Sequence, residues 1–151
     1  MNADAVDEPL RLLLVEDNDA HAEMVKRSFE QHKIPNVIFH VDDGQKALDY
    51  IFHEGDYSDV KKYPRPHCVL LDLRLPKVDG LEVLRRIKAD EITRKTPVVI
   101  LTTSSADKDI AQSYEYHANS YVVKPMDFPR FESLMEELGY YWLAWNQNPW
   151  R

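Results

Sequence analysis

The sequence is poor in cysteine and glycine and has no long apolar run. Its 151 residues include one cysteine and four glycines, so no internal disulfide forms, and there is no glycine-rich phosphate-binding loop. No segment approaches the roughly 20 apolar residues that a membrane-spanning helix needs. Residues 1–9 are acidic and lack the basic and apolar regions of a signal peptide, so we expect a cytoplasmic protein with no membrane contact.

Basic charge is also scarce. The 19 Lys and Arg residues are outnumbered by 26 Asp and Glu, which gives a formal net charge of -7 at pH 7. Nucleic acids and anionic membranes attract cationic surfaces, so this charge argues against both as nonspecific partners. The lone Cys68 lies inside an apolar run, which favours a small core residue over a reactive thiol.

Short apolar runs alternate along the chain with segments whose apolar residues have helical spacing. The predicted strands span residues 10–15, 37–41, 67–72, 97–101 and 120–123. The predicted helices span residues 19–32, 45–52, 80–88, 107–117 and a segment from 128 onward, and Asp19 is expected to cap the first. Five strand–helix units without a break in composition predict one α/β domain: a doubly wound, five-stranded parallel sheet with flanking helices.

Three segments fall outside this alternation. Residues 1–9 are expected to be a disordered acidic N-terminus, ahead of a domain over residues 10–139. Residues 53–66 are long for a connection between a helix and a strand, and are either functional or a tolerated insertion. Residues 140–151 form an extension rich in Tyr and Trp, which either folds back on the protomer or contacts a partner.

Polar residues follow the predicted strands, at the edge where the carboxyl ends of parallel strands meet. They are Glu16, Asp17, Asp72, Thr102 and Lys124. Each alone is ordinary at a turn or strand end, but ligands collect at this edge in open α/β sheets. Three acids in close contact require a cation, and Mg²⁺ prefers oxygen ligands. Asp72 is then the candidate nucleophile for an acyl phosphate, with Lys124 paired to a phosphate oxygen and Thr102 donating its hydroxyl.

Four segments resemble the receiver domain of response regulators, the phosphate-accepting half of two-component signalling. They are residues 12–18, 70–80, 100–104 and 121–125. The resemblance extends over residues 10–138 and implies a flavodoxin-like fold with strand order 2-1-3-4-5. It also implies a sensor histidine kinase as partner and Mg²⁺ as cofactor.

The resemblance implies a role for each matching residue. Asp72 is the expected phosphorylation site and Lys124 its phosphate partner. The expected ligands of Mg²⁺ are Asp17, Asp72 and the backbone carbonyl of Arg74, with Glu16 acting through water where many members of the family have Asp.

The resemblance further implies a switch. Thr102 is drawn toward the phosphate, Tyr121 moves inward as a rotamer switch, and a cis peptide bond before Pro125 positions the preceding lysine. The face formed by helix 107–117, strand 120–123 and the last helix then changes shape. We expect a homodimer through this face and the C-terminal aromatics, because Tyr and Trp are frequent in interfaces and an edge strand needs covering. Packing within a monomer is the alternative.

The predicted function is that of a stand-alone response regulator whose output is a protein contact. Residues 53–66, residues 101–105 and the aromatic C-terminus further resemble single-domain regulators of phytochrome-type sensor histidine kinases, which implies red/far-red light as the signal. Beyond its own phosphoryl transfer and dephosphorylation, the protein is not expected to be an enzyme.

Two other functions compete with this prediction. The first is a metal-dependent phosphatase or hydrolase with Asp72 as covalent nucleophile. Such enzymes usually have a second acid two residues later, where this chain has Arg74. The second is a degenerate receiver that acts as a constitutive scaffold, against which the complete set of site residues counts.

Overall fold

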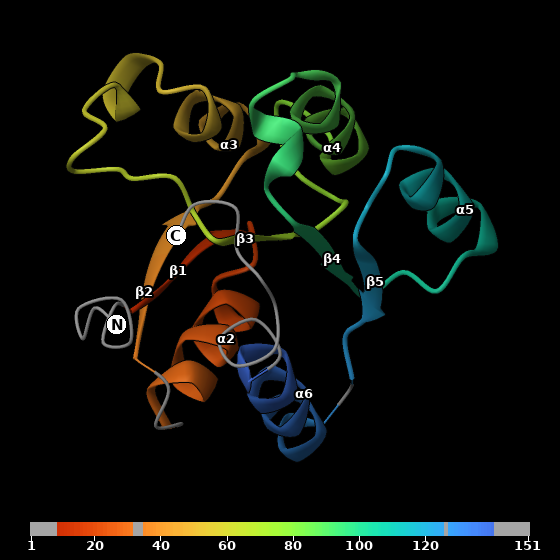
Figure 1. Cartoon of the computed structure of the whole chain (residues 1–151). Helices are drawn as coiled ribbons and strands as arrows, with labels where there is room; N and C mark the ends of the chain where they lie inside the picture. The colour runs from red at the N-terminus through yellow and green to blue at the C-terminus, as the bar shows by residue number, and fades with distance from the viewer. Residues whose placement is uncertain (1–8, 32–34, 126, 141–151) are drawn as a thin grey trace, which may run out of the picture.

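A computed structural model describes residues 9–31, 35–125 and 127–140, which form a five-stranded parallel sheet between two layers of helices (Figure 1). The strand order is β2-β1-β3-β4-β5. The strands are β1 (Leu10–Val15), β2 (Asn36–Val41), β3 (Cys68–Leu71), β4 (Val98–Thr102) and β5 (Ser120–Val123). The predicted doubly wound sheet and its order are confirmed, and each strand begins and ends within one residue of its predicted position.

Helices cover both faces of the sheet (Figure 1). On one face lie α2 (Asp19–Gln31) and α6 (Phe128–Tyr140), and on the other lie α3 (Gly44–Ile51), α4 (Gly80–Ala89) and α5 (Asp107–Glu115). Strand residues point alternately to the two layers, so Leu13 packs with α3 and α4 while Leu12 packs with α2 and α6. No helix among these described residues is long and apolar enough to cross a membrane.

The helices begin and end within one residue of their predicted positions except at the end of α5, and the cap of α2 also differs from the prediction. Asn18, rather than Asp19, caps α2, because its Oδ1 accepts a hydrogen bond of 3.0 Å from the backbone N–H of His21. The helix expected over residues 107–117 ends at Glu115, since His117 has a φ of 68° and the N–H of Ala118 donates back to the carbonyl of Ser113. That pairing is a Schellman motif formed without glycine.

The pairing register brings the carboxyl ends of the strands to one edge. Val15 lies beside Leu71, and Thr102 lies beside Val123. The backbone N–H of Asp72 continues this pairing by donating to the carbonyl of Val15 at 3.1 Å. Residues that directly follow β1, β3, β4 and β5 therefore face a common space.

Residues 53–66 are anchored to the protein by a tyrosine cluster, which we define as Phe39, Tyr50, Tyr57 and Tyr63. The ring centroids in this cluster lie 4.9–6.4 Å apart. The hydroxyl of Tyr50 also donates to the carbonyl of Pro64 at 2.9 Å. The connection therefore packs against the β2 side of the sheet, and the short 3₁₀ helix η1 (Gly55–Tyr57) forms within it.

The terminal segments fall almost wholly outside the described residues. This applies to the predicted N-terminus over residues 1–9, of which only Pro9 is described, and to the aromatic extension over residues 140–151. Cys68 is fully buried in β3, and burial raises the pKa of its thiol, as expected for a core residue.

Candidate functional site

The three acids predicted to meet at the sheet edge do meet there. Glu16, Asp17 and Asp72 each offer a carboxylate oxygen, and these oxygens lie within 4.8 Å of one another. Glu16 is only 2% exposed and Asp72 9% exposed, whereas Asp17 is open to solvent. The cluster is thus buried on one side and accessible on the other. A site that admits an ion or a phosphate donor needs such an opening.

Lys124 enters the cluster from the end of β5. Its Nζ donates to Asp72 Oδ2 at 2.9 Å and also hydrogen bonds to Glu16 Oε1. The lysine is itself 7% exposed, so its ammonium compensates the carboxylates in a space largely closed to water. The predicted pairing of Lys124 with Asp72 is therefore present in this structure.

The two buried acids differ in their ionisation. Burial, together with the neighbouring Asp72, raises the pKa of Glu16 to about 7. Burial acts in the same direction on Asp72, but hydrogen bonds with Glu16 and Lys124 and the charge of Lys124 bring its pKa below the ordinary value. Asp72 therefore stays ionised, which a carboxylate nucleophile requires, while Glu16 holds a shared proton more readily.

The donor set fits a hard divalent cation. Glu16 Oε2 is buried, and no hydrogen-bonding group in the described part of the chain reaches it. A buried carboxylate oxygen without a partner is costly, and a cation beside it would remove that cost. With Asp17 and Asp72 adjacent, the available ligand atoms are all oxygens, which suits Mg²⁺ or Mn²⁺.

Of the two expected switch residues, Thr102 contacts Asp72 directly, and Tyr121 contacts the loop after β4. Thr102 is completely buried, and a hydrogen bond between its side chain and Asp72 helps to lower the pKa of that acid. Tyr121 is half-buried, and its hydroxyl donates to the carbonyl of Ser104 at 2.9 Å. The tyrosine is thus tied to the loop that follows Thr102.

The peptide bond before Pro125 does not have the expected geometry. No peptide bond among the described residues is cis, so the prediction of a cis bond at this position is wrong for this structure. The ammonium of Lys124 reaches Asp72 from a trans linkage, and the backbone N–H of Lys124 holds its place by donating to the carbonyl of Thr102 at 2.7 Å.

Arg74 has a side-chain contact that the sequence did not reveal. Its backbone N–H donates to Asp72 Oδ1 at 3.3 Å, close to where its carbonyl was expected to serve a metal. Its guanidinium crosses to Asp109 Oδ2 at 3.0 Å, and the same oxygen accepts from the hydroxyl of Ser104 at 2.6 Å. Asp109 thereby links the loop after β3 to the loop after β4.

Two histidines at this edge were also missed. His40 Nε2 lies 2.8 Å from the carbonyl of Glu16, and His21 Nδ1 lies 3.0 Å from Lys124 Nζ. Burial and the charge of Lys124 lower the pKa of His21. His21 lies in the first turn of α2, and no spacing in the sequence pointed to its contact with Lys124, 103 residues further along the chain.

Gly80 permits the tight approach of α4 to the site. A Cβ at this position would lie 2.3 Å from the carbonyl oxygen of Asp72 and 2.6 Å from the Cα of Leu73. Both neighbours are backbone atoms, which cannot rotate away as the end of a side chain can. Glycine at position 80 therefore allows α4 to pack closely against the loop that carries Asp72.

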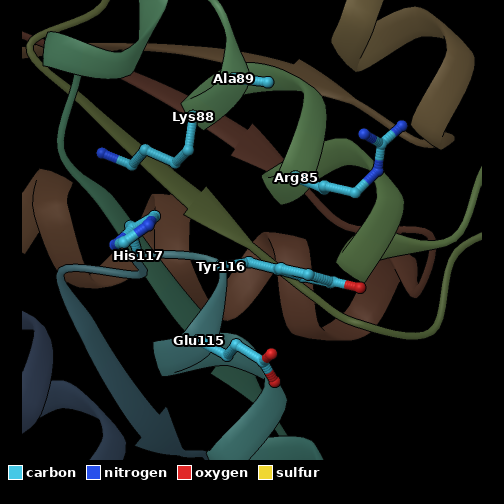
Figure 2. A pocket seen from close by; sticks show the side chains of 6 residues that line it. All are labelled: Arg85, Lys88, Ala89, Glu115, Tyr116 and His117. Carbon is cyan, nitrogen blue, oxygen red and sulfur yellow. The ribbon is translucent and has the colours of Figure 1, made fainter.

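A second hollow lies away from this edge, between α4 and α5 (Figure 2). Its volume is about 250 Å³, and Arg85, Lys88 and Tyr116 are among its lining residues. The cations already have partners: Arg85 pairs with Glu82, and Lys88 donates to three carbonyl oxygens at 2.9–3.0 Å. The hollow contains none of the site residues predicted from the sequence.

Comparisons with known proteins agree with this geometry. The model of the response regulator receiver domain matches residues 12–136. The probable methanogenesis regulatory protein FilR2 of Methanothrix harundinacea is 47% identical, and the match covers 95% of this chain and 90% of FilR2. The response regulator Rcp1 of Synechocystis is 35% identical, with 93% of this chain and 94% of Rcp1 covered.

Solved structures extend the match to three dimensions. The phosphorylated cyanobacterial phytochrome response regulator RcpA superposes with a TM-score of 0.88 at 34% identity, covering 94% of this chain and 99% of RcpA. The Mn²⁺-bound form of Rcp1 gives a TM-score of 0.86 at 35% identity, covering 93% of this chain and 99% of that structure. The chain belongs to the response regulator receiver family.

Proposed function

We propose that this protein accepts a phosphoryl group from a sensor histidine kinase onto Asp72, in a reaction that depends on Mg²⁺. The observation that carries the proposal is the convergence of three carboxylates and Lys124 on one partly open space. Family membership supports it, because receiver domains bind divalent metal and work with histidine kinases. The Mn²⁺-bound form of Rcp1 supports the binding of a divalent metal.

The residues of the site have distinct tasks in this proposal. Asp72 attacks phosphorus with one carboxylate oxygen, so an O–P bond forms while the bond from phosphorus to the donor histidine breaks. Lys124, already 2.9 Å from Asp72, pairs with an oxygen of the arriving phosphoryl group. Asp17, Asp72 and the Arg74 carbonyl would hold Mg²⁺, with Glu16 acting through water; the ion supplies positive charge to the transferring group.

A small-molecule phosphate donor tests the proposal directly. After incubation with acetyl phosphate and Mg²⁺, we expect intact mass to show one added phosphate, stable in acid and lost in base or hydroxylamine. Asp72→Asn should abolish the adduct. Asp79→Asn, in the same loop but exposed, should leave it unchanged. A wild-type protein without an adduct would contradict the proposal.

The same incubation separates a receiver from a phosphatase. A hydrolase with Asp72 as covalent nucleophile turns over phosphate esters repeatedly, whereas a receiver carries one phosphate. Arg74 occupies the position where such a hydrolase has its second acid, and its guanidinium pairs with Asp109 instead. We therefore expect no sustained hydrolysis of p-nitrophenyl phosphate; multiple turnovers that disappear in Asp72→Asn would favour the hydrolase. Decay of the single adduct after removal of the donor would measure dephosphorylation by the protein itself.

We further propose that the output is a contact between protein surfaces, and specifically a homodimer through α5, β5 and α6. Two large apolar side chains are exposed on this face, Tyr114 at 48% and Val123 at 41%. β5 is an edge strand of the sheet, which favours covering by another chain. Tyr121 connects this face to Ser104 and so to the loop beside Thr102.

Sedimentation of matched variants tests the dimer. Val123→Glu should shift the mass toward the monomer, as should truncation after Gly139. Val60→Glu places the same substitution at an exposed apolar residue of the connection between α3 and β3, and should not change the mass. A wild-type monomer with and without phosphate would overturn the dimer.

The sensor that supplies the phosphate has two candidates. Similarity to RcpA and Rcp1 supports a phytochrome-type histidine kinase, and therefore control by red and far-red light. The higher identity to FilR2 supports the second candidate, a role in regulating methanogenesis. Phosphotransfer from a phytochrome-type kinase, measured under red and far-red light, tests the first: transfer that changes with light supports it, and no transfer would overturn it.

A further inference from the structure

His21, in the first turn of α2, contacts the ammonium group of Lys124. Its Nδ1 lies 3.0 Å from Lys124 Nζ and 3.5 Å from Glu16 Oε1. The side chain is one-third exposed, so the ring closes the solvent side of a cluster that is otherwise buried. The proposed phosphoryl transfer gives this residue no role of its own.

The hydrogen bonds of Lys124 determine which nitrogen of the His21 ring accepts and which carries the hydrogen. An ammonium has three N–H donors and no acceptor, and three acceptors surround this one: Asp72 Oδ2, Glu16 Oε1 and His21 Nδ1. Because Lys124 can only donate, Nδ1 must accept, which places the hydrogen of the neutral ring on Nε2. Every donor of the lysine is therefore satisfied.

We propose that His21 is a positioning residue for phosphoryl transfer, holding the third hydrogen of the Lys124 ammonium so that the ammonium stays aimed at Asp72. This inference rests on the proposed function, since it concerns how Lys124 meets the phosphate. It differs from the roles of the two acids because His21 neither binds the phosphate nor needs a metal.

A neutral acceptor suits this position for an electrostatic reason. As the O–P bond to Asp72 forms and the bond to the leaving group breaks, the attacking oxygen becomes the bridging oxygen of an acyl phosphate. It then no longer carries a negative charge. Glu16 would also interact with a bound cation, so both carboxylates would weaken as partners of Lys124. His21 Nδ1 keeps its hydrogen bond throughout, and without a charge it does not hold the ammonium back from the phosphoryl oxygens.

Rates measured on three variants test this role. With acetyl phosphate as donor, the phosphate adds to Asp72 and acetate leaves. His21→Leu removes the acceptor and should slow the addition about tenfold, as expected for one hydrogen bond to a charged group. His21→Asn offers an amide oxygen close to the position of Nδ1 and should restore the rate to within about threefold. Arg27→Leu, exposed on the same helix, should match the wild type.

A spectroscopic measurement tests the hydrogen bond without any phosphoryl transfer. In the metal-free, unphosphorylated protein, long-range ¹H–¹⁵N correlations should identify His21 with its hydrogen on Nε2 and an acceptor Nδ1. Lys124→Met should move the Nδ1 resonance toward that of a free imidazole nitrogen, whereas Lys108→Met, at an exposed lysine of α5, should not. An Nδ1 resonance that ignores Lys124→Met would overturn the hydrogen bond.

The outcomes separate this inference from the proposed function. If the wild type takes no phosphate, the proposed function fails and the positioning role fails with it. If the wild type is phosphorylated but His21→Leu is equally fast, only the positioning role fails. An Asn variant as slow as the Leu variant would also overturn it, because a lost acceptor would then not explain the effect.

Discussion

Replacing Glu16 with Gln should stabilise the metal-free protein at neutral and alkaline pH. The carboxyl group is buried and lies beside Asp72, and both effects raise its pKa from 4.5 to about 7. One pKa unit corresponds to about 1.4 kcal/mol, so ionising Glu16 in the folded state costs up to about 3 kcal/mol. Gln has nearly the same shape, keeps an oxygen for Lys124, and does not ionise.

The sign of the pH dependence follows from proton binding. Between pH 4.5 and about 7 the folded protein binds a proton at Glu16 more readily than the unfolded chain does. The contribution of Glu16 to the free energy of unfolding therefore falls as pH rises through this range. His21, whose pKa is lowered, acts in the opposite direction near its ordinary pKa, so the quantity to compare is the difference between the two proteins.

Urea unfolding with EDTA at pH 5, 6, 7 and 8 measures this difference. At pH 5 the two proteins should have similar free energies of unfolding, because Glu16 is then mostly protonated. At pH 8 the Gln variant should be more stable by up to about 3 kcal/mol. Glu82→Gln, which removes one partner of an exposed ion pair with Arg85, should change stability by less than about 1 kcal/mol at any pH.

Metal should reduce or nearly cancel the advantage of the Gln variant. Mg²⁺ at about 100 times its dissociation constant adds about 2.7 kcal/mol to a folded state that binds it. The wild type should gain this at pH 8, and the Gln variant should gain less, because it lacks one of the three carboxylates. A Gln variant less stable than the wild type at pH 8 without metal, or a difference that does not depend on pH, would refute this account of Glu16.

Three further substitutions probe contacts that hold the fold and the site together. Lys88→Met should lower the free energy of unfolding by about 2–4 kcal/mol, because three carbonyl oxygens lose a charged donor; Lys95→Met serves as the exposed control in urea unfolding. Gly80→Ala should cost about 3 kcal/mol and slow phosphorylation by acetyl phosphate, because the added Cβ would lie 2.3 Å from the Asp72 carbonyl oxygen. Tyr63→Ala should loosen residues 53–66 and speed tryptic cleavage after Lys62, while costing about 2 kcal/mol in urea unfolding. A Tyr63 variant as resistant to trypsin as the wild type would show that the tyrosine cluster does not hold the loop.

The sheet and the acidic cluster could be predicted because they depend on few variables. A buried parallel strand is a short apolar run, and such runs alternate with helical spacing throughout this sequence. Once the sheet is parallel, Glu16, Asp72 and Lys124 must share an edge, whatever their separation along the chain. Backbone topology alone therefore brings them together.

Contacts that depend on the path of a loop or on a rotamer could not be predicted. Asn18 and Asp19 are equally good caps in sequence, and only the backbone at the start of α2 selects the asparagine. Residues 53–66 are polar overall, which hides the fact that Tyr57 and Tyr63 pack against Tyr50. His21 was hidden in the same way, since its partner lies 103 residues away.

The most consequential of these contacts concerns how a change at Asp72 reaches the far face. Ser104 donates its hydroxyl to Asp109 and accepts at its carbonyl from Tyr121, so one residue bonds both to α5 and to β5. Its N–H also lies 3.4 Å from the hydroxyl of Thr102, which must move if that hydroxyl is drawn to a phosphate. A shift of Thr102 therefore strains bonds to both elements of the face at once, while Arg74 resists it through Asp109. Because these bonds share one short loop, we expect a joint rearrangement of α5 and β5 on phosphorylation, so that the surface offered to a partner changes as a unit.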